Sequence, residues 1–496
     1  MPAPVPLTDA TLDQLPGDVA APGYDRAALR PAVVHIGVGG FHRAHQAVYF
    51  DDLARTGETG WGVVGVGLHS RAIGEVLEAQ DRLYLVVERG PEQDSGRVVG
   101  VHTGYLHAPS DPEAVLATLA AETTRLVTIT ITGTAYAIDP HTGDFTPGDD
   151  EGVAHDLADP EHPETVFGYL VEGLRRRRDA GLPPFTVLSC DNMQSNGEAA
   201  RTAIVSFARE RDAGLADWID ANVSFPSSMV DRITPATPPE ERDAVAAALG
   251  VDDRWPVIAE PFRQWVVEDR FCNERPPLDR VGVQFVDDVG PYETMKTRLL
   301  NGAHTAIAYL GYLAGHRTTD EVMSDPVYRE FLTRLLAEEI APLLPEVPGV
   351  DIAEYQQTLL DRLGNPRMAD QLSRLGRRGS SKIPNYLLPS AREAIEAGRP
   401  HQLLCLAIAG WLRFLRGEDY AGDEVPLEGP RLDLVPIAQE GGSDPSSLLD
   451  EQAVFHDFGR HPEFAAEVRR ALESLERQGP REAIEEQLRA GSGAQA

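Results

Sequence analysis

The chain has 496 residues, of which 42% are hydrophobic, so it is long enough to form more than one buried core. Asp and Glu outnumber Lys and Arg by 78 to 45, which gives a formal net charge of −33 at pH 7. So negative a charge argues against nucleic acid or an anionic membrane surface as a partner.

The three cysteines, Cys190, Cys272 and Cys405, lie far apart and show no C-x-x-C spacing. We therefore expect neither a disulfide framework nor a structural zinc site, and a reducing compartment fits this usage best. The N-terminal segment lacks the basic and apolar regions of a signal peptide. The sequence also contains no run of about 18 apolar residues, so we expect a cytoplasmic protein without a membrane span.

Short apolar runs alternate with helical patterns in the first half of the chain. The predicted strands are residues 33–36, 61–68, 83–88, 126–132, 186–189 and 281–286, and helices are predicted at 44–53, 71–79 and 165–178. Alternation of this kind is typical of an open α/β sheet with parallel strands.

The remainder of the chain shows helical patterns almost throughout. Helices are predicted at residues 322–340, 352–363, 390–397, 403–415 and 462–475. We therefore predict two domains, an α/β domain at residues 1–287 and a helical domain at residues 288–496. Ligands commonly bind where two domains meet, so a cleft is expected there.

A glycine-rich turn follows the first predicted strand in the segment H-I-G-V-G-G-F-H-R. Gly37 and Gly39 begin a G-x-G-x-x pattern, and in this context the pattern indicates a loop that receives a dinucleotide pyrophosphate. His42 stands where the full pattern has its third glycine, so a plain turn without a ligand is an equally good interpretation of the pattern alone. His42 and His45 could also form a metal-binding pair, but no carboxylate or third histidine has suitable spacing.

A helical segment in P-Y-E-T-M-K-T-R-L-L-N-G-A-H places Lys296, Asn301 and His304 on one arc. At about 100° per residue, His304 lies about 80° and Asn301 about 140° from Lys296. Apolar residues of the same helix form the neighbouring stripe, so the polar trio borders the buried face. A lysine in such a place can lose solvation, which lowers its pKa toward values useful for a general base. The alternative is a solvated amphipathic helix whose lysine extends to water.

These segments, together with S-C-D-N, S-F-P-S-S-M-V-D-R-I-T-P and G-S-S-K-I-P, resemble the long-chain polyol dehydrogenases. The resemblance extends from about residue 30 to the C-terminus, and its blocks agree in order. It implies a Rossmann-type dinucleotide-binding domain followed by a mostly α-helical domain. It also implies a monomeric, metal-independent oxidoreductase that uses NAD or NADP to interconvert a polyol and a ketose, D-mannitol and D-fructose in the most similar branch.

The resemblance assigns roles to individual residues. Lys296 matches the general base, Asn192 and Asn301 the amides that bind the reacting oxygen, His304 a substrate-orienting residue and Glu293 a carboxylate that gates proton exchange. Asp231, Arg374 and Lys382 match polyol-binding positions; without the resemblance they are an ordinary salt-bridged aspartate, a solvated arginine and a loop lysine. The residues predicted to bind the cofactor are Gly37, Gly39, Gly40, Phe41, His42, Arg43 and Arg71.

Two positions depart from the pattern of the family. Gly133 stands where close relatives have the glutamate of T-E-G-G-Y, and Arg71-Ala72 stands where members that prefer NAD have an acidic pair. Because Arg71 could pair with a 2′-phosphate, we predict that NADP is accepted at least comparably to NAD. The alternative is that Arg71 is a solvated residue of the first helical turn. The loss of the glutamate leaves two further functions open: a relative acting on fructuronate or D-arabinitol, and a dinucleotide-binding sensor with impaired catalysis.

Overall fold

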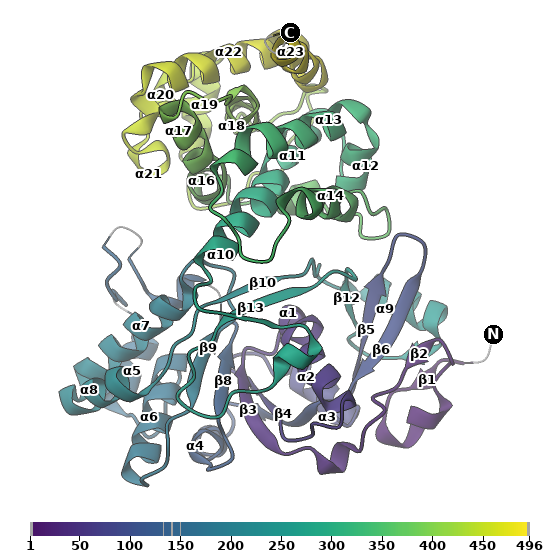
Figure 1. Cartoon of the computed structure of the whole chain (residues 1–496), viewed down its shortest axis with the longest axis vertical. Helices are drawn as coiled ribbons and strands as arrows, with labels where there is room; N and C mark the ends of the chain where they lie inside the picture. Colours follow the sequence, from purple (N-terminus) through teal and green to yellow (C-terminus); the bar gives the residue numbers. More distant parts are fainter. Residues whose placement is uncertain (1–2, 132, 140–141, 149, 494–496) are drawn as a thin grey trace. The chain divides into compact units, whose positions relative to one another are not determined.

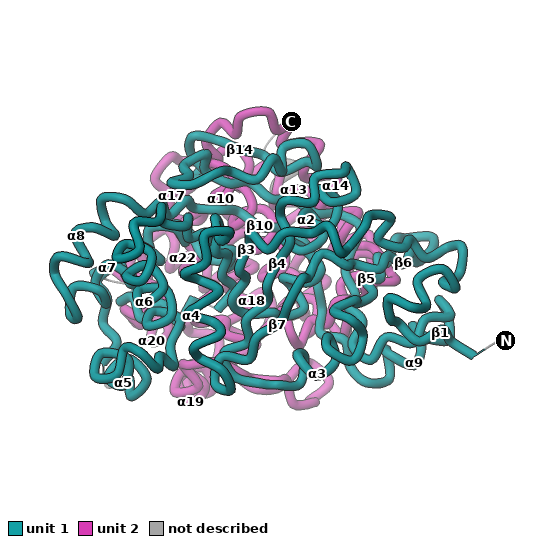
Figure 2. The backbone as a smooth tube through the Cα atoms, turned by 90° about the horizontal axis from the view of Figure 1, so that it is seen from below, with its two compact units in different colours: residues 1–290 teal, residues 291–496 magenta. Residues whose placement is uncertain are grey.

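The computed structural model describes residues 3–131, 133–139, 142–148 and 150–493 (Figure 1). The chain forms two compact units, Met1–Gly290 and Pro291–Ala496 (Figure 2), and each unit is described by itself. Among the helices of the described residues, none combines the length and the apolar character that crossing a membrane requires.

The first unit is built on a five-stranded sheet in which all neighbouring strands are parallel. Its strand order is β7 (His102–His107), β4 (Gly62–Gly67), β3 (Pro31–Ile36), β8 (Leu126–Ile129) and β9 (Thr186–Ser189). The strand of this sheet that comes first along the chain, β3, lies in its centre. The strands β4 and β7 lie on one side of it, and β8 and β9 on the other. This is the strand order of a Rossmann-type fold, in which ligands bind beyond the carboxyl ends of the strands where the order reverses.

Helices cover both faces of this sheet. Val34 and Ile36 of β3 are buried with apolar residues of α4 (Pro112–Ala120), α6 (Val166–Asp179), α7 (Asn196–Arg211) and α8 (Ala213–Asn222). Val33 is buried in a separate cluster with residues of α2 (Gln46–Arg55) and α3 (Ala72–Ala79). Because alternate side chains of β3 are buried on opposite faces, its sequence is a nearly continuous apolar run. The unit also contains α1 (Gly40–Ala44), α5 (Glu151–Ala158) and α9 (Pro239–Leu249).

Three smaller sheets complete the first unit. They contain β12 (Val257–Ala259), β5 (Tyr84–Arg89), β6 (Asp94–Val99) and β2 (Val19–Ala20); β10 (Ser228–Asp231), β13 (Gln264–Glu268) and β14 (Gln284–Val286); and β1 (Val5–Pro6) with β11 (Val251–Asp252). The predicted strand 83–88 corresponds to β5 and pairs antiparallel with β6. On its other side β5 pairs parallel with β12, so it belongs to a mixed sheet and not, as expected, to the five-stranded parallel sheet. A short hairpin at residues 90–93 gives β5 its antiparallel partner.

The second unit is helical. Its central helix is α18 (Gln402–Phe414), whose residues 403–414 are all buried, and α11 (Gly302–Leu313) and α22 (Pro462–Gln478) pack against it. A helix buried on every side is apolar all round, as the sequence L-L-C-L-A-I-A-G-W-L is. The other helices are α10 (Gly290–Lys296), α12 (Thr319–Ser324), α13 (Pro326–Arg334), α14 (Ile352–Leu363), α15 (Leu372–Leu375), α16 (Gly379–Lys382), α17 (Leu388–Glu396), α19 (Leu434–Gly441), α20 (Ser446–Leu449), α21 (Gln452–Phe455) and α23 (Pro480–Gly493).

Three segments of the second unit are π-helical turns, at Thr297–Asn301, Leu335–Ile340 and Ile383–Leu387. The first of them packs against the other two. A π-helix forms i→i+5 hydrogen bonds, so it contains more residues per turn than an α-helix and often marks a functional position.

One long predicted helix, at residues 322–340, is divided in the structure. It consists of the end of α12, then α13, then the π-helical turn Leu335–Ile340. Pro326 causes the first break, because its nitrogen carries no hydrogen to donate to the preceding turn. Asp325 caps the new helix by accepting a hydrogen bond from the Val327 N–H (2.8 Å).

Candidate active site

The glycine turn lies at the carboxyl end of the central strand β3. Gly37 has φ +100°, and a Cβ atom on it would lie 2.2 Å from the carbonyl oxygen of Thr130, just beyond the end of β8. Gly39 caps α1, and its N–H donates to the Gly37 carbonyl (2.7 Å). The turn therefore lies where the strand order reverses, with the N-terminus of α1 directly after it, as the sequence pattern predicted.

The side chains of His42 and Arg43 are not available to a cofactor. His42 is 1% exposed and stacks on His35, with ring centroids 3.3 Å apart, and Arg43 is 3% exposed and donates to the Trp255 carbonyl (2.6 Å). Any contact of these two residues with a dinucleotide is therefore restricted to their backbone. Their place among the predicted cofactor-binding residues stays a prediction, because both residues belong to the first turns of α1, where backbone N–H groups can face a pyrophosphate.

The histidine pair considered as a metal site is used elsewhere. The Nε2 atom of His42 lies 3.2 Å from Nε2 of His102, and Nε2 of His45 donates to the Gln264 carbonyl (2.9 Å). Burial lowers the pKa of His45 and of His102 to about 3, so both rings are neutral. Within the described part of the chain, no group of three or more His, Cys, Asp or Glu side chains is arranged to hold a metal ion.

Arg71 ends the turn that follows β4 and is the N-terminal cap residue of α3. It is exposed, and its Nε donates to the Ser110 hydroxyl (3.0 Å) after the end of β7. Its guanidinium therefore lies in water at the same edge of the sheet as the glycine turn. At this edge, Rossmann-type domains contact the 2′-hydroxyl or the 2′-phosphate of the ribose of their dinucleotide.

Asn192 lies at the same edge, in the loop after β9. It is exposed, whereas its neighbour Asp191 is 7% exposed and accepts hydrogen bonds from the Ile131 N–H (3.1 Å) and the Tyr136 hydroxyl (2.7 Å). Asp231 is the last residue of β10 and is 2% exposed. The structure thus presents Asn192 on the surface of the first unit and buries Asp231 within it.

In the second unit, α10 ends at Lys296 and the π-helical turn Thr297–Asn301 follows at once. Glu293 and Lys296 are 7% and 6% exposed, and Asn301 and His304 are half-buried. The constant step of about 100° per residue does not hold between Lys296 and Asn301, because a π-helix advances by a smaller angle per residue. The predicted angles were therefore wrong, although the trio does lie at the border of the core.

His304 lies among charged groups of the second unit. The Nε2 atom of its ring is buried and has no hydrogen-bond partner among the described residues, and burial lowers its pKa to about 4. The charges of Asp370, Arg374 and Lys382 are close enough to act on this pKa. The structure therefore brings three of the predicted site residues, His304, Arg374 and Lys382, into one neighbourhood.

The two cations beside His304 differ in their partners. Arg374 forms an ion pair with Asp370, with Nε–Oδ1 2.8 Å, and the Asp370 carboxylate is 4% exposed. Lys382 donates from Nζ to the Leu375 carbonyl (2.6 Å), and burial followed by the charge of Arg374 lowers its pKa to about 8. Asp370 was missed in the sequence, because a single aspartate in a loop has no pattern that distinguishes it.

Comparison with known proteins identifies the family. The model of the mannitol dehydrogenase Rossmann domain matches residues 31–280, and that of the mannitol dehydrogenase C-terminal domain matches residues 288–476. The chain belongs to the mannitol dehydrogenase family. The resemblance inferred from the sequence blocks is thereby confirmed, as is the Rossmann-type fold followed by a helical domain.

Full-length relatives in this family are similar over nearly the whole chain. Mannitol 2-dehydrogenase of Phaeosphaeria nodorum is 43% identical over 490 residues, which cover 97% of this chain and 86% of the relative. That of Emericella nidulans is 43% identical over 481 residues, covering 95% and 96% of the two chains.

Two solved structures have the same architecture. Mannitol 2-dehydrogenase of Pseudomonas fluorescens, in a ternary complex with NAD and D-mannitol, is 41% identical with a TM-score of 0.87 and covers 98% of this chain and 99% of its own. A D-sorbitol dehydrogenase in substrate-free form is 38% identical with a TM-score of 0.90, and the match covers 96% of this chain and 100% of that one.

Gly133, the position at which the sequence resemblance led us to expect a glutamate, lies beside the Asn192 loop of this mannitol dehydrogenase family member. A Cβ atom on Gly133 would lie 3.5 Å from the sulfur of Met193, which is an ordinary contact. The backbone at Gly133 therefore leaves room for a side chain. Because glycine has no side chain, this room next to Met193 stays open. Thr132, also part of this segment, lies outside the described residues.

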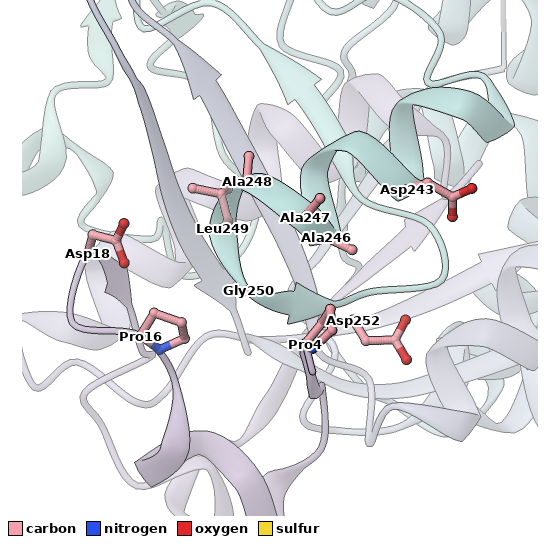
Figure 3. A pocket seen from close by; sticks show the side chains of 10 residues that line it. All are labelled: Pro4, Pro16, Asp18, Asp243, Ala246, Ala247, Ala248, Leu249, Gly250 and Asp252. Carbon is pink, nitrogen blue, oxygen red and sulfur yellow. The ribbon is translucent and has the colours of Figure 1, made fainter. Parts of the chain in front are cut away.

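A surface pocket of about 620 Å³ lies elsewhere on the first unit (Figure 3). Asp18, Asp243 and Asp252 line it together with small apolar residues at the C-terminal end of α9. None of the predicted site residues of this mannitol dehydrogenase family member contributes to it. Its described lining residues include three carboxylates and no cation, an arrangement that repels a dinucleotide, so we do not consider this pocket a candidate for the cofactor site.

Proposed function

We propose that the chain is an NAD(P)-dependent polyol dehydrogenase that interconverts D-mannitol and D-fructose. Support comes from the P. fluorescens mannitol 2-dehydrogenase, which was solved with NAD and D-mannitol and is similar to this chain over nearly its whole length. The glycine turn, the exposed Asn192 and the buried Lys296 provide the chemical groups that such a reaction needs.

The observation that carries the proposal is the lysine usage of this chain. Of the 45 basic residues, only Lys296 and Lys382 are lysines, and all others are arginines. Arginine stays protonated in proteins, whereas a buried lysine can lose its proton. Retention of lysine at 296, where the side chain is 6% exposed, fits a role that requires proton transfer.

In the proposed reaction, the neutral amine of Lys296 takes the proton from the substrate hydroxyl. The amide groups of Asn192 and Asn301 donate hydrogen bonds to the same oxygen while it carries negative charge, which lowers the barrier as an oxyanion hole does. Glu293, three residues before Lys296 on α10, passes the proton toward solvent. Nicotinamide, when bound, supplies the hydride acceptor or donor.

The residues of the glycine turn fit a dinucleotide. Gly37 brings the backbone so close to Thr130 that no side chain fits, and Gly39, at the start of α1, is exposed. We propose that Gly37, Gly39, Gly40 and Phe41, with the backbone of His42 and Arg43, hold the pyrophosphate. Arg71, exposed after β4, would bind a ribose 2′-phosphate, so we propose that NADP serves as well as NAD.

The polyol side of the site is proposed to consist of His304, Arg374, Lys382 and Asp231. A polyhydroxylated substrate requires several donors and acceptors, and these side chains offer both. The buried Nε2 atom of His304, which has no hydrogen-bond partner among the described residues, is suited to a substrate hydroxyl. We further propose that residues 1–287 form the dinucleotide-binding domain, that residues 288–496 form the domain with most of the substrate-binding and catalytic residues, and that the protein acts as a monomer.

Assays of ketose reduction test this proposal directly. Consumption of NADH and of NADPH should be followed with D-fructose, with fructuronate and with xylulose, the ketose that corresponds to D-arabinitol. If kcat/KM is highest with D-fructose, the proposal is supported. If it is higher with fructuronate or xylulose, that compound and not D-fructose is the substrate. Absence of turnover with all three, despite cofactor binding, would indicate a sensor. Activity that survives prolonged EDTA treatment supports the metal-independent mechanism.

A further inference from the structure

The loop that carries Asn192 follows β9, an outer strand of the parallel sheet. A loop at the edge of a sheet has few backbone partners, so buried side chains must fix its position. Tyr136 and Asn196, which have no assigned role, supply these contacts. They are 1% and 0% exposed, respectively.

Tyr136 connects the end of β9 to the loop. Its hydroxyl donates to Oδ2 of Asp191 (2.7 Å) and lies 2.6 Å from the Ser189 hydroxyl, which also accepts a hydrogen bond from the Asp191 N–H (3.4 Å). Burial raises the pKa of Tyr136 well above its ordinary value, so the phenol keeps the proton that it donates. The Ser189 hydroxyl therefore donates to the Tyr136 oxygen, and the three side chains form one ordered chain of hydrogen bonds.

Asn196 holds the loop from its other end. Its Nδ2 donates both to the Asp191 carbonyl (2.9 Å) and to the Ser228 carbonyl (2.8 Å), and its Oδ1 accepts from the Ser228 N–H (2.9 Å). The Ser228 hydroxyl donates to the Ser189 carbonyl (2.6 Å). Asn196 thus fastens the peptide group directly before Asn192 to the first residue of β10, the strand that ends at Asp231.

We propose that Tyr136 and Asn196 are positioning residues that fix the backbone at Asn192, so that its amide is held in place for the reacting oxygen. This inference rests on the catalytic role proposed for Asn192. A donor contributes to catalysis only when it is held within about 0.5 Å of the productive position, which requires supporting hydrogen bonds. Tyr136, which binds the Asp191 side chain, and Asn196, which binds the Asp191 carbonyl, are both buried. Water therefore cannot replace their hydrogen bonds at low cost.

The variant Tyr136→Phe tests the proposal, because it removes one hydroxyl and keeps the ring. Its matched control is Tyr169→Phe: Tyr169 is also 1% exposed, belongs to the same buried cluster, and donates to the Ala108 carbonyl (3.2 Å). We expect Tyr136→Phe to lower kcat for polyol oxidation by about 10–100-fold, part of the loss caused by removing an oxyanion donor. Tyr169→Phe should keep kcat, and both variants should keep the Kd for NADH.

A double-mutant cycle with Asn192→Ala separates positioning from a general loss of stability. If Tyr136 acts through Asn192, adding Tyr136→Phe to Asn192→Ala should change kcat by less than about threefold. If Tyr136→Phe lowered kcat by the same factor in the native protein and in Asn192→Ala, and Asn192→Ala itself had a low kcat, only the positioning role of Tyr136 would be overturned. An unchanged kcat in Asn192→Ala would overturn the proposed role of Asn192 and the inference with it.

A second variant keeps the test decisive if Tyr136→Phe does not fold. Ser189→Ala removes the hydroxyl that donates to Tyr136, and it leaves the Tyr136–Asp191 hydrogen bond in place. We expect a smaller loss of kcat that again disappears in the Asn192→Ala background. The inference would be overturned if Ser189→Ala lowered kcat equally in the Asn192→Ala variant, or if it left kcat unchanged in the protein that keeps Asn192.

Discussion

The Gly37 backbone lies so close to the Thr130 carbonyl oxygen that a Cβ atom on residue 37 would be 2.2 Å from it. This contact joins the ends of β3 and β8, the two strands between which the order of the sheet reverses. A glycine is therefore required here for two reasons, the close approach and the positive φ. The glycine turn can form only if both conditions are met.

Replacing Gly37 with Ala should therefore weaken dinucleotide binding. We expect the Kd for NADH, measured by fluorescence titration, to rise at least about tenfold, because the backbone N–H groups shift away from the pyrophosphate. Gly282→Ala is the matched control: Gly282 has a similar φ of +95°, but apart from its chain neighbours no described residue has an atom within 4 Å of its Cβ position. An unchanged Kd for Gly37→Ala would contradict the assignment of this turn to the cofactor.

Lys296→Ala should abolish most polyol oxidation while leaving the Kd for NADH unchanged. Loss of a general base lowers the rate by about 10²–10⁴-fold. Added primary amines should restore part of the activity, since a small amine can take the proton in the space that Lys296 leaves. A variant with kcat close to that of the native enzyme would show that another group is the base.

Arg71→Glu should shift the cofactor preference from NADP toward NAD. A carboxylate repels a 2′-phosphate, and loss of a charge-assisted hydrogen bond weakens binding by about 1.5–3 kcal/mol, or at least about tenfold. The ratio of kcat/KM for the two cofactors measures the shift. Arg280→Glu, at another exposed arginine of the first unit, controls for the change in net charge. Equal ratios in native enzyme and Arg71→Glu would mean that Arg71 does not contact the ribose.

Lys382 should titrate near pH 8, because burial and then Arg374 lower its pKa to about 8 from the usual 10.5. Between these values the unfolded chain binds more protons, so the free energy of unfolding should rise with pH in this window. Lys382→Met should remove that part of the rise, which urea denaturation measures. The chain has only two lysines, so NMR of the reductively methylated protein follows Lys382 directly. A midpoint near 10.5 would contradict the prediction.

Glu339 should make the second unit less stable as pH rises from about 4.5 to 7. This carboxyl is 3% exposed and accepts hydrogen bonds from the Leu403 and Leu404 N–H groups at the start of α18. Burial raises its pKa to about 7 from 4.5, so the folded chain binds more protons in this window. The free energy of unfolding therefore falls as pH rises.

Glu339→Gln should flatten this dependence of stability on pH, and Glu354→Gln, at an exposed position of α14, should not. Urea denaturation at pH 4.5, 5.5 and 7 measures the slope for each variant. Parallel slopes for native protein and Glu339→Gln would show that another group causes the pH dependence.

Local patterns predicted many elements of this fold. The strand at 186–189 and the helix at 352–363 have the predicted bounds in the structure. Alternation and 3.6-residue periodicity depend only on neighbours in the sequence, so they can be read without the fold. The same patterns did not reveal that β5 pairs in a second sheet, because strand pairing depends on which segments meet in space.

The candidate site shows the same division. Residue types and spacing were enough to select Lys296 and the glycine turn, and the family resemblance added Asn192, since motifs and sequence blocks are local. Burial of Arg43 beneath the turn and the contact between Tyr136 and Asp191 were not visible. The sequence by itself determined the family and the order of most helices and strands, and it selected the groups that we propose to react. Only the tertiary structure decided which side chains are buried and which partners they have, because burial and hydrogen bonding join residues that are far apart along the chain.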